Sequence, residues 1–296
     1  MKEYVQNSRN QHLPFFSRYG IWVDILRLDL IHPIISGNKW FKLKYYLEDA
    51  RETNKSTLVS FGGVYSNHLV ATAFAAKKEG LKSIGYVRGD KETKLSTTLV
   101  NAKNYGMQLF FIDRKKYRNK EGIKRENIQP NQYWIMEGGY GTLGAKGASE
   151  ILKLTDINPY SHIICALGTG TMMAGLIKGS LPHQEVMGIS VMKNNLDLEN
   201  DVHLLLDKTE YEKKFSFIHD YHFGGYAKHP KQLIDFMKEI WLIEKLPTDI
   251  IYNSKMLFAV RDLLSKDYFK PGTKLLLIHS GGLQGNKSLP ADCLPF

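Results

Sequence analysis

The chain has 296 residues, of which 43% are hydrophobic and 24% are charged, an ordinary composition for a globular protein that excludes a mainly disordered chain. No stretch approaches the roughly 18 to 20 uninterrupted apolar residues of a membrane span, and Cys165 and Cys293 are too few for a disulfide framework or a cysteine metal site. Lysine and arginine outnumber the acidic residues by 40 to 30, a surplus that suits either a nucleic-acid-binding protein or an enzyme with an anionic ligand.

The distribution of the basic residues favours the enzyme. The densest basic run, 113–125, includes acidic residues and has no repeated aromatic residues on which bases could stack. Residues 1–13 lack the apolar core of a secretion signal. We therefore expect a cytoplasmic protein with no nucleic-acid partner, no membrane partner and no metal ion.

Short apolar runs alternate with longer amphipathic or alanine-rich segments along the whole chain. In the first part of the chain they predict one or two strands over 20–33, and then a helix over 39–53 that is opened by Ser36, Gly37 and Asn38. The middle part predicts strands over 56–63, 81–89, 107–113 and 131–139, helices over 66–80 and 93–106, and a polar stretch over 113–132. The last part predicts strands over 161–168, 185–192 and 274–282, and helices over 142–157, 169–181, 197–214 and 230–266. Strands that alternate with helices of about ten or more residues are typical of parallel sheets covered by helices. The sequence therefore predicts an α/β fold.

Four predicted strands end in loops of small residues, at 61–68, 137–144, 166–175 and 278–286. Tight strand-to-helix turns can require glycine without any ligand. In a parallel sheet, however, ligands bind beyond the carboxyl ends of the strands, where such loops present free backbone N–H groups. Four loops at corresponding positions therefore indicate a ligand-binding crevice.

The loop from Gly168 to Thr171 is the clearest candidate for an anion site. It would place the N-terminus of a helix, with its unpaired N–H groups, beside the hydroxyls of Thr169 and Thr171. Gly168 and Gly170 have the spacing of the first two glycines of a dinucleotide motif, but the next predicted strand ends in lysine and asparagine where that motif has an acidic residue. A single phosphate is therefore the ligand that this loop fits best.

Lys39 follows Gly37 and Asn38 at the start of a predicted helix. The positive end of the helix would lower the pKa of its ammonium group and favour the neutral amine, which attacks carbonyl groups. From position alone, the alternative is a solvated surface lysine, one of several beside Lys42 and Lys44.

Five motifs occur in an order that resembles one enzyme family. They are SGNKWFKLKYYLEDA, GGVYSNHLVATAFAAKKEG, EGGYGTLGAKGASEI, CALGTGTMMAGL and HSGGLQGN. The chain resembles the D-cysteine desulfhydrase/1-aminocyclopropane-1-carboxylate deaminase family, which are pyridoxal-phosphate enzymes with the fold of the tryptophan-synthase β subunit (fold type II). The similarity extends from about residue 15 to residue 286.

This resemblance implies a fold and a cofactor. It implies a large discontinuous domain over 1–50 and 147–296, a smaller inserted α/β domain over 51–146, and a homodimer. By position, Lys39 matches the lysine that carries pyridoxal 5'-phosphate covalently. The segment of Gly168, Thr169, Gly170 and Thr171 matches the loop that binds the cofactor's phosphate.

The resemblance also implies roles for a turn and for two tyrosines. Ser66, Asn67 and His68 match a turn in which the asparagine contacts the ring hydroxyl of the cofactor, while the serine and nearby N–H groups hold the substrate carboxylate. Tyr226 and Tyr252 align with two active-site tyrosines that assist proton transfer or position the leaving group. Ser66 could equally be a helix N-cap, and the two functions are compatible.

Departures from the family pattern bear on the substrate. Asn253 stands where the deaminase has a glutamate that pairs with the pyridine nitrogen, and Ser280 stands where it has a leucine. D-cysteine desulfhydrases contact the ring nitrogen with a threonine hydroxyl at the position of Ser280. A hydroxyl leaves that nitrogen largely unprotonated, which suits loss of a good β-leaving group better than opening of a cyclopropane ring. Val70 and Ala71 replace the family's usual Arg-Gln, so a substrate outside both named activities is compatible with the sequence.

We therefore expect a pyridoxal-phosphate-dependent lyase or deaminase that acts on a small amino acid. The first candidate reaction is β-elimination of D-cysteine to pyruvate, ammonia and sulfide, and the alternative within the family is 1-aminocyclopropane-1-carboxylate deamination. A catalytically silent protein that binds pyridoxal phosphate is the alternative from another class. Binding alone would not require Lys39, Ser66, Asn67 and both tyrosines.

Overall fold

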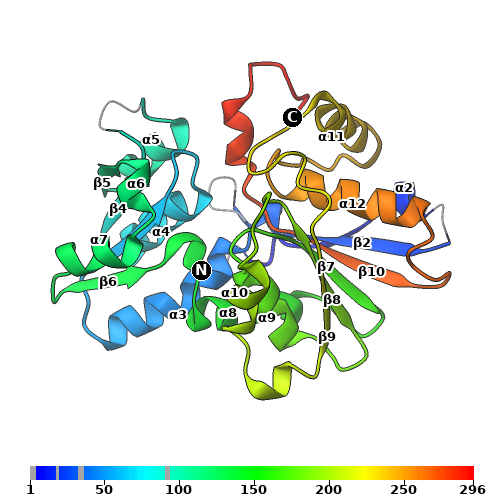
Figure 1. The fold of residues 1–296 in the computed structure, drawn as a ribbon, viewed down its shortest axis with the longest axis horizontal. Helices are drawn as coiled ribbons and strands as arrows, with labels where there is room; N and C mark the ends of the chain where they lie inside the picture. Colours follow the sequence, from blue (N-terminus) through cyan, green and yellow to red (C-terminus); the bar gives the residue numbers. More distant parts are fainter. Residues whose placement is uncertain (1–4, 18–19, 33–36, 91–93) are drawn as a thin grey trace.

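The computed structural model describes residues 5–17, 20–32, 37–90 and 94–296, which form two sheets (Figure 1). The larger sheet has six strands, in the order β1 (Asn10–His12), β2 (Trp22–Arg27), β10 (Lys274–His279), β7 (His162–Leu167), β8 (Glu185–Ser190) and β9 (Lys214–Ile218). Only the β1–β2 pair is antiparallel among these neighbours. The predicted α/β fold with mostly parallel strands is therefore confirmed.

The smaller sheet has four parallel strands, in the order β5 (Met107–Ile112), β4 (Lys82–Arg88), β3 (Thr57–Gly62) and β6 (Gln132–Ile135). All of its strands come from the part of the sequence predicted as the inserted domain. The larger sheet takes its strands from both sides of that part. The division into two domains with the stated boundaries remains a prediction.

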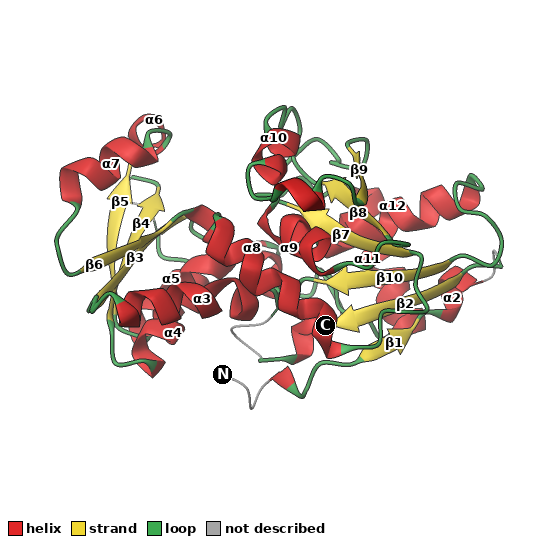
Figure 2. Cartoon of the chain, turned by 90° about the horizontal axis from the view of Figure 1, so that it is seen from below, coloured by secondary structure: helices red, strands yellow, loops and turns green. Residues whose placement is uncertain are grey.

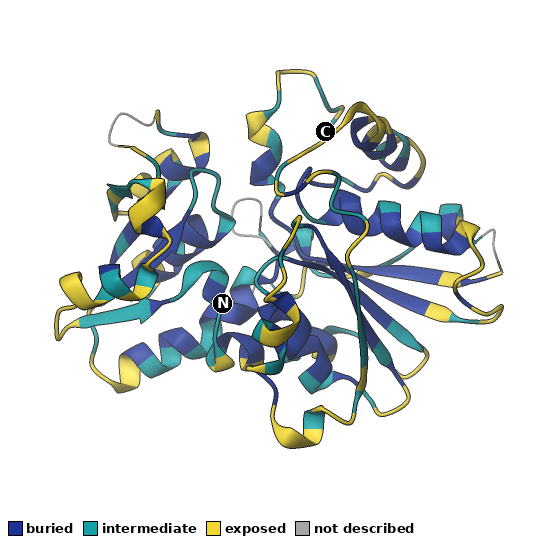
Figure 3. Ribbon diagram, viewed as in Figure 1, coloured by how far each residue is buried: buried dark blue, intermediate teal, exposed yellow. Residues whose placement is uncertain are grey.

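The larger sheet is buried on both faces, because side chains alternate between two apolar clusters. Ile163 and Cys165 of β7 pack into one cluster, while Ile164 and Ala166 of the same strand pack into the other. Figure 3 shows these central strands buried along almost their whole length. Strands that are covered on both faces consist of continuous runs of apolar residues. These runs are the reason why the central strands could be predicted from the sequence.

The helices cover these sheets and connect their strands. They are α2 (Pro14–Ser17), α3 (Lys39–Glu52), α4 (Asn67–Lys78), α5 (Thr97–Asn104), α6 (Arg114–Tyr117), α7 (Lys120–Asn127), α8 (Thr142–Ser149), α9 (Thr171–Gly179), α10 (Leu198–His203), α11 (Lys231–Glu244) and α12 (Asn253–Ser265). Within the described ranges, every helix is too short or too polar to cross a membrane.

Helices α3, α8 and α9 lie between the two sheets (Figure 2). They approach one another closely through glycine. A Cβ atom on Gly147 of α8 would lie 2.0 Å from the backbone oxygen of Phe41 in α3, and one on Gly175 of α9 would lie 2.5 Å from the oxygen of Ala145 in α8. Any side chain at these two positions would push the helices apart.

Some predicted elements differ from the structure. The polar stretch 113–132 contains α6 and α7, which Asp113 and Asn119 cap by accepting backbone N–H groups; these surface helices bury too few residues to show an apolar period. The helix predicted over 197–214 is only α10, and the one predicted over 142–157 continues after α8 as a 3₁₀ turn. The segment 230–266 is two helices, because Lys245 ends α11 in a left-handed conformation with φ +51°.

Strands β1 and β9 were not predicted. Ser36, which was predicted to open the helix over 39–53, lies outside the described residues.

Candidate functional site

A cavity of about 420 Å³ lies beyond the carboxyl ends of β3, β4, β7 and β10. All four of the predicted glycine-rich loops contribute to its wall. The contributing residues of these loops are Gly63, Val64, Tyr65, Ser66, Asn67, His68, Glu137, Gly138, Ala166, Leu167, Gly168, Thr169, Gly170, Met172, Met173, Ser280, Gly281, Gly282 and Gly285. Cavities of this size are ordinary for small-molecule sites.

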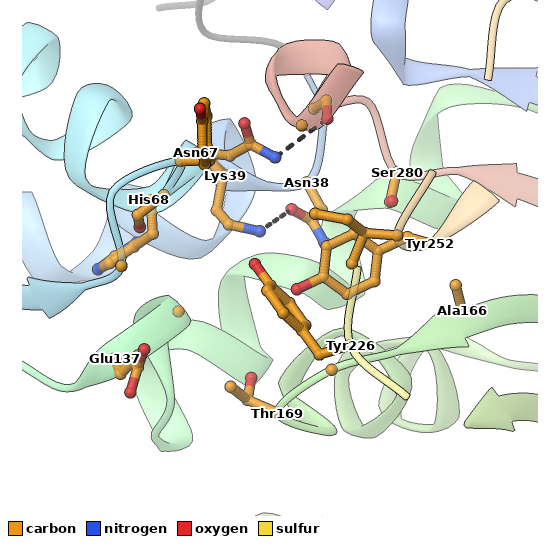
Figure 4. Close-up of a pocket in the computed structure, with 18 of the residues that line it drawn as sticks. Asn38, Lys39, Asn67, His68, Glu137, Ala166, Thr169, Tyr226, Tyr252 and Ser280 are labelled. Atoms are coloured by element: carbon orange, nitrogen blue, oxygen red, sulfur yellow. Dashed lines mark hydrogen bonds between the residues drawn. The ribbon is translucent and has the colours of Figure 1, made fainter. Parts of the chain in front are cut away.

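Lys39 is the first residue of α3, and its amine points into the cavity (Figure 4). The Nζ atom donates a hydrogen bond to Asn38 Oδ1 at 2.6 Å. Burial lowers the pKa of Lys39 to about 8, against the opposing effect of the negative charge on Asp249. The direction agrees with the prediction, and desolvation is the main cause of the shift.

The backbone before Lys39 is fixed by the loop after β10. Gly37 has φ +78°, and a Cβ there would lie 1.7 Å from the oxygen of Ser280. Asn38 N donates to the same oxygen at 3.1 Å. Gly37 is therefore required both for its left-handed conformation and for this close approach.

Ser66 is the N-cap of α4, and its Oγ accepts a hydrogen bond from Leu69 N at 3.2 Å. Its hydroxyl proton thus stays available for an anion at the helix N-terminus, where backbone N–H groups are also unpaired. Asn67 Nδ2 donates to Gly282 O at 3.1 Å, while Oδ1 is buried without a hydrogen-bond partner among the described residues. The turn predicted to bind an anion is therefore both a cap and a wall of the cavity.

The side chain of His68 is held against β3. Its Nε2 lies 2.8 Å from Ser60 Oγ, which itself donates to Ile135 O at 2.8 Å. Nε2 must therefore carry the proton that Ser60 accepts. Burial and the charges of Lys39 and Lys42 keep the pKa of His68 well below its ordinary value, so the ring is neutral.

Three residues of the predicted phosphate loop, Gly168, Thr169 and Gly170, line the cavity. Gly170 is the N-cap of α9 with φ +74°, and a Cβ there would lie 2.6 Å from a methyl group of Val202. Thr171 is fully buried and does not line the cavity; its hydroxyl lies 3.0 Å from that of Thr169. Thr171 can thus orient the hydroxyl of Thr169; its contact with the cofactor stays a prediction.

Lys42, expected at the surface from the sequence, is a second buried lysine. It is 4% exposed, lines the cavity, and donates to Gly138 O at 3.3 Å. Gly138 lies against Thr169, because a Cβ on it would be 2.9 Å from the Thr169 methyl group. Burial holds the pKa of Lys42 well below its ordinary value, and the charge of Lys39 adds to the shift. The spacing of three residues from Lys39, on one face of the helix, is the signal that could have found it.

Tyr226 and Tyr252 both line the cavity and are in T-shaped contact with each other, with ring centroids 6.4 Å apart and an angle of 74° between the planes. Figure 4 shows both side chains beside the Lys39 amine. Burial raises the pKa of Tyr252 well above its ordinary value, so this phenol stays protonated and can donate. Lys255, fully buried in α12, donates to Gly225 O at 2.7 Å and His222 O at 3.0 Å, and so fixes the loop that carries Tyr226.

Ser280 lines the cavity and Asn253 lies behind it, fully buried. Asn253 Oδ1 accepts from Ser280 N at 2.9 Å and from Ser280 Oγ at 3.3 Å. Asn253 Nδ2 donates to Asp249 Oδ2 at 2.5 Å, and Asp249 also accepts the backbone N–H groups of residues 251–253. This network fixes the Ser280 hydroxyl at the cavity surface and keeps the Asp249 carboxylate behind it.

These residues fit pyridoxal phosphate. The cavity brings together an amine of lowered pKa, a helix N-terminus with hydroxyls that suits a phosphate, and a buried acceptor, Asn67 Oδ1, without a partner in the described chain. Lys39 would hold the carbonyl end of the cofactor, and Gly168 to Gly170 with Lys42 its phosphate.

Comparisons with known proteins agree with this chemistry. The family model described as "Pyridoxal-phosphate dependent enzyme" matches residues 11–281. A protein of Pyrococcus horikoshii that carries the name "Putative 1-aminocyclopropane-1-carboxylate deaminase" is 33% identical, with 93% of this chain and 89% of that protein covered. The "Bifunctional D-cysteine desulfhydrase/1-aminocyclopropane-1-carboxylate deaminase, mitochondrial" of Arabidopsis thaliana is 27% identical, with 90% of this chain and 73% of that protein covered.

A solved crystal structure of an ACC deaminase homologue superposes with a TM-score of 0.79 at 30% sequence identity, covering 95% of this chain and 90% of that one. The agreement thus extends from the local chemistry of the cavity to the path of nearly the whole chain. The chain belongs to the family of pyridoxal-phosphate-dependent enzymes, and it has their fold-type II architecture.

Proposed function

We propose that the protein eliminates the β-substituent of a small amino acid, with D-cysteine as the first candidate substrate. The observation that carries this proposal is the Ser280 hydroxyl at the cavity surface, with the neutral amide of Asn253 behind it. Among the described residues on the cavity wall, Glu137 is the one carboxylate, and it pairs with Lys120 at 3.0 Å. A pyridine ring beside Ser280 would therefore meet a hydroxyl instead of an acid.

The bound cofactor supplies a carbonyl that captures the substrate amine and a ring that takes up the electrons released at Cα. Lys39, whose lowered pKa leaves much of it neutral near pH 8, serves as the base that removes the Cα proton. Ser66 and the first N–H groups of α4 hold the substrate carboxylate. The phenols of Tyr226 and Tyr252, which burial keeps protonated by raising their pKa values, donate a proton to the departing sulfur.

The overall reaction is D-cysteine and water to pyruvate, ammonia and hydrogen sulfide. The bond from Cβ to sulfur breaks, and water replaces nitrogen at Cα. No oxidant or reductant is needed, because the three-carbon skeleton stays intact and the gain of hydrogen at Cβ balances the oxidation of Cα to a carbonyl.

Deamination of 1-aminocyclopropane-1-carboxylate is the second candidate. It is supported by the names that the P. horikoshii and A. thaliana relatives carry. Against it stands Asn253, where the family's deaminase has a glutamate for the pyridine nitrogen. Cytoplasmic location and a homodimer remain part of the proposal, and size-exclusion chromatography with light scattering would measure the oligomeric state.

The test is product release from the holoenzyme across a panel of D- and L-amino acids, with Lys39→Ala as the inactive control. We expect equal amounts of pyruvate, ammonia and sulfide from D-cysteine. Rapid formation of 2-oxobutanoate from 1-aminocyclopropane-1-carboxylate without sulfide from D-cysteine would favour the second candidate. Cofactor binding without turnover of any amino acid would favour a silent binding protein.

A further inference from the structure

One cation on the cavity wall has no part in the proposed reaction. Arg88 is the last residue of β4, and its side chain reaches the cavity from the smaller sheet. A Cβ atom on Gly63 would lie 3.7 Å from Arg88 Nη2 and would meet no other atom within 4 Å outside the adjoining residues. The guanidinium therefore stands beside the loop that leads to Ser66, with open space next to the glycine.

Arg88 has no carboxylate partner within ion-pair distance in the part of the chain that the structure describes. The ring of Tyr117 lies beside it, with its centroid 5.9 Å from the guanidinium carbon. Its charge also opposes the rise in the pKa of Tyr226 that burial causes, which places it close to that phenol. Glu137, the acid on the same wall, already pairs with Lys120.

Two other parts of the cavity wall that suit an anion are already accounted for by the cofactor and by the substrate's α-carboxylate. The N-terminus of α9 with Lys42 suits the cofactor's phosphate, and the N-terminus of α4 with Ser66 suits the substrate's α-carboxylate. Arg88 is a third site, on the Gly63 side of the α4 turn and near Tyr226. A guanidinium there presents a planar fork of N–H donors that matches a carboxylate, sulfonate or phosphate group.

We propose that Arg88 determines specificity by binding an anionic group on the side chain of the substrate, so that among β-substituted amino acids an anionic side chain (a sulfonate, or cysteine as its thiolate) binds more tightly than a neutral one. This inference rests on the proposed function, because it assumes an amino acid held by its carboxylate at Ser66. Arg88 acts on binding of the substrate side chain, whereas Lys39 acts on the bond at Cα.

The experiment compares 3-sulfoalanine with serine, in both D and L forms, as ligands of the holoenzyme. The Kd comes from the change in cofactor absorbance on titration, and KM and kcat come from 2-oxo acid release where turnover occurs. The variants are Arg88→Gln, which removes the charge, and Arg88→Lys, which keeps the charge without the fork. Lys82→Gln is the matched control, because Lys82 is the exposed first residue of the same strand.

We expect the wild type to bind one isomer of 3-sulfoalanine at least about tenfold more tightly than serine. Loss of a charge-assisted pair predicts that Arg88→Gln weakens 3-sulfoalanine about 10- to 100-fold while serine changes little. Arg88→Lys should be intermediate, and Lys82→Gln should match the wild type.

Two results would overturn the proposal. In the first, Arg88→Gln raises the Kd of serine and of 3-sulfoalanine by the same factor, or the wild type binds both ligands with the same Kd. Arg88 then does not bind the substrate side chain, although the proposed elimination stands. If no amino acid changes the cofactor spectrum of any variant, both the proposal and the proposed function fail.

Discussion

The amine of Lys39 should titrate far below an ordinary lysine. Burial lowers its pKa to about 8, whereas an exposed lysine titrates near 10.4. At pH 7 the neutral fraction is then about 200-fold larger than that of an exposed lysine. That difference accounts for selective attachment of an aldehyde to this lysine.

Competitive labelling measures this pKa residue by residue. The apoenzyme would react with a trace of an acetylating reagent across a range of about pH 6 to 11, and mapped peptides would give the labelling of each lysine. Lys39 should show a midpoint near pH 8. Lys44 is the internal control, because its hydrogen bond to Glu150 raises its pKa above the ordinary value.

A midpoint for Lys39 at or above that of an ordinary lysine would refute the desolvation argument.

The same pKa shift makes the stability of the folded chain depend on pH. Between pH 8 and the ordinary lysine value the unfolded chain binds more protons at this position than the folded chain, so the free energy of unfolding contributed by Lys39 rises with pH in that window.

Three further substitutions test other parts of the site. Gly170→Glu should weaken cofactor retention at least about tenfold, because its side chain would collide with Val202 and repel the phosphate; a variant that folds and keeps cofactor after dialysis like the parent would place the phosphate elsewhere. Ser280→Ala should slow elimination about 5- to 150-fold, the kinetic equivalent of one buried hydrogen bond, while cofactor absorbance is retained; an unchanged kcat would remove Ser280 from the mechanism. Lys255→Met should lower kcat more than it raises KM, because it removes the two hydrogen bonds that hold the loop of Tyr226 but leaves the cofactor pocket intact. An equal change in kcat and KM would contradict this positioning role.

Much of the fold could be predicted from local pattern. The runs around β7 and β10 are apolar along their whole length because both faces of the larger sheet are covered. Strand β9 was missed because its residues are only partly buried at the sheet edge, which leaves no continuous apolar signal. The short helices α6 and α7 were missed because capping side chains, more than an apolar stripe, define them.

The site could be predicted where loops carry their own chemistry, as in Gly168 to Thr171 and Ser66. Residues that reach the cavity from elsewhere could not. Lys42 looks like a surface lysine until glycines of α8 allow that helix to cover it. Arg88 ends a strand without a motif, and only the position of β4 beside β3 brings it to the cavity.

The measurement that tests the account most directly is the location of the cofactor on the chain. Holoenzyme reduced with borohydride, digested and mapped by mass spectrometry should carry the pyridoxyl group on Lys39, and Lys39→Ala should carry none. An adduct on Lys42, which lines the same cavity one helical turn away, would contradict the assignment of Lys39 and the reaction built on it.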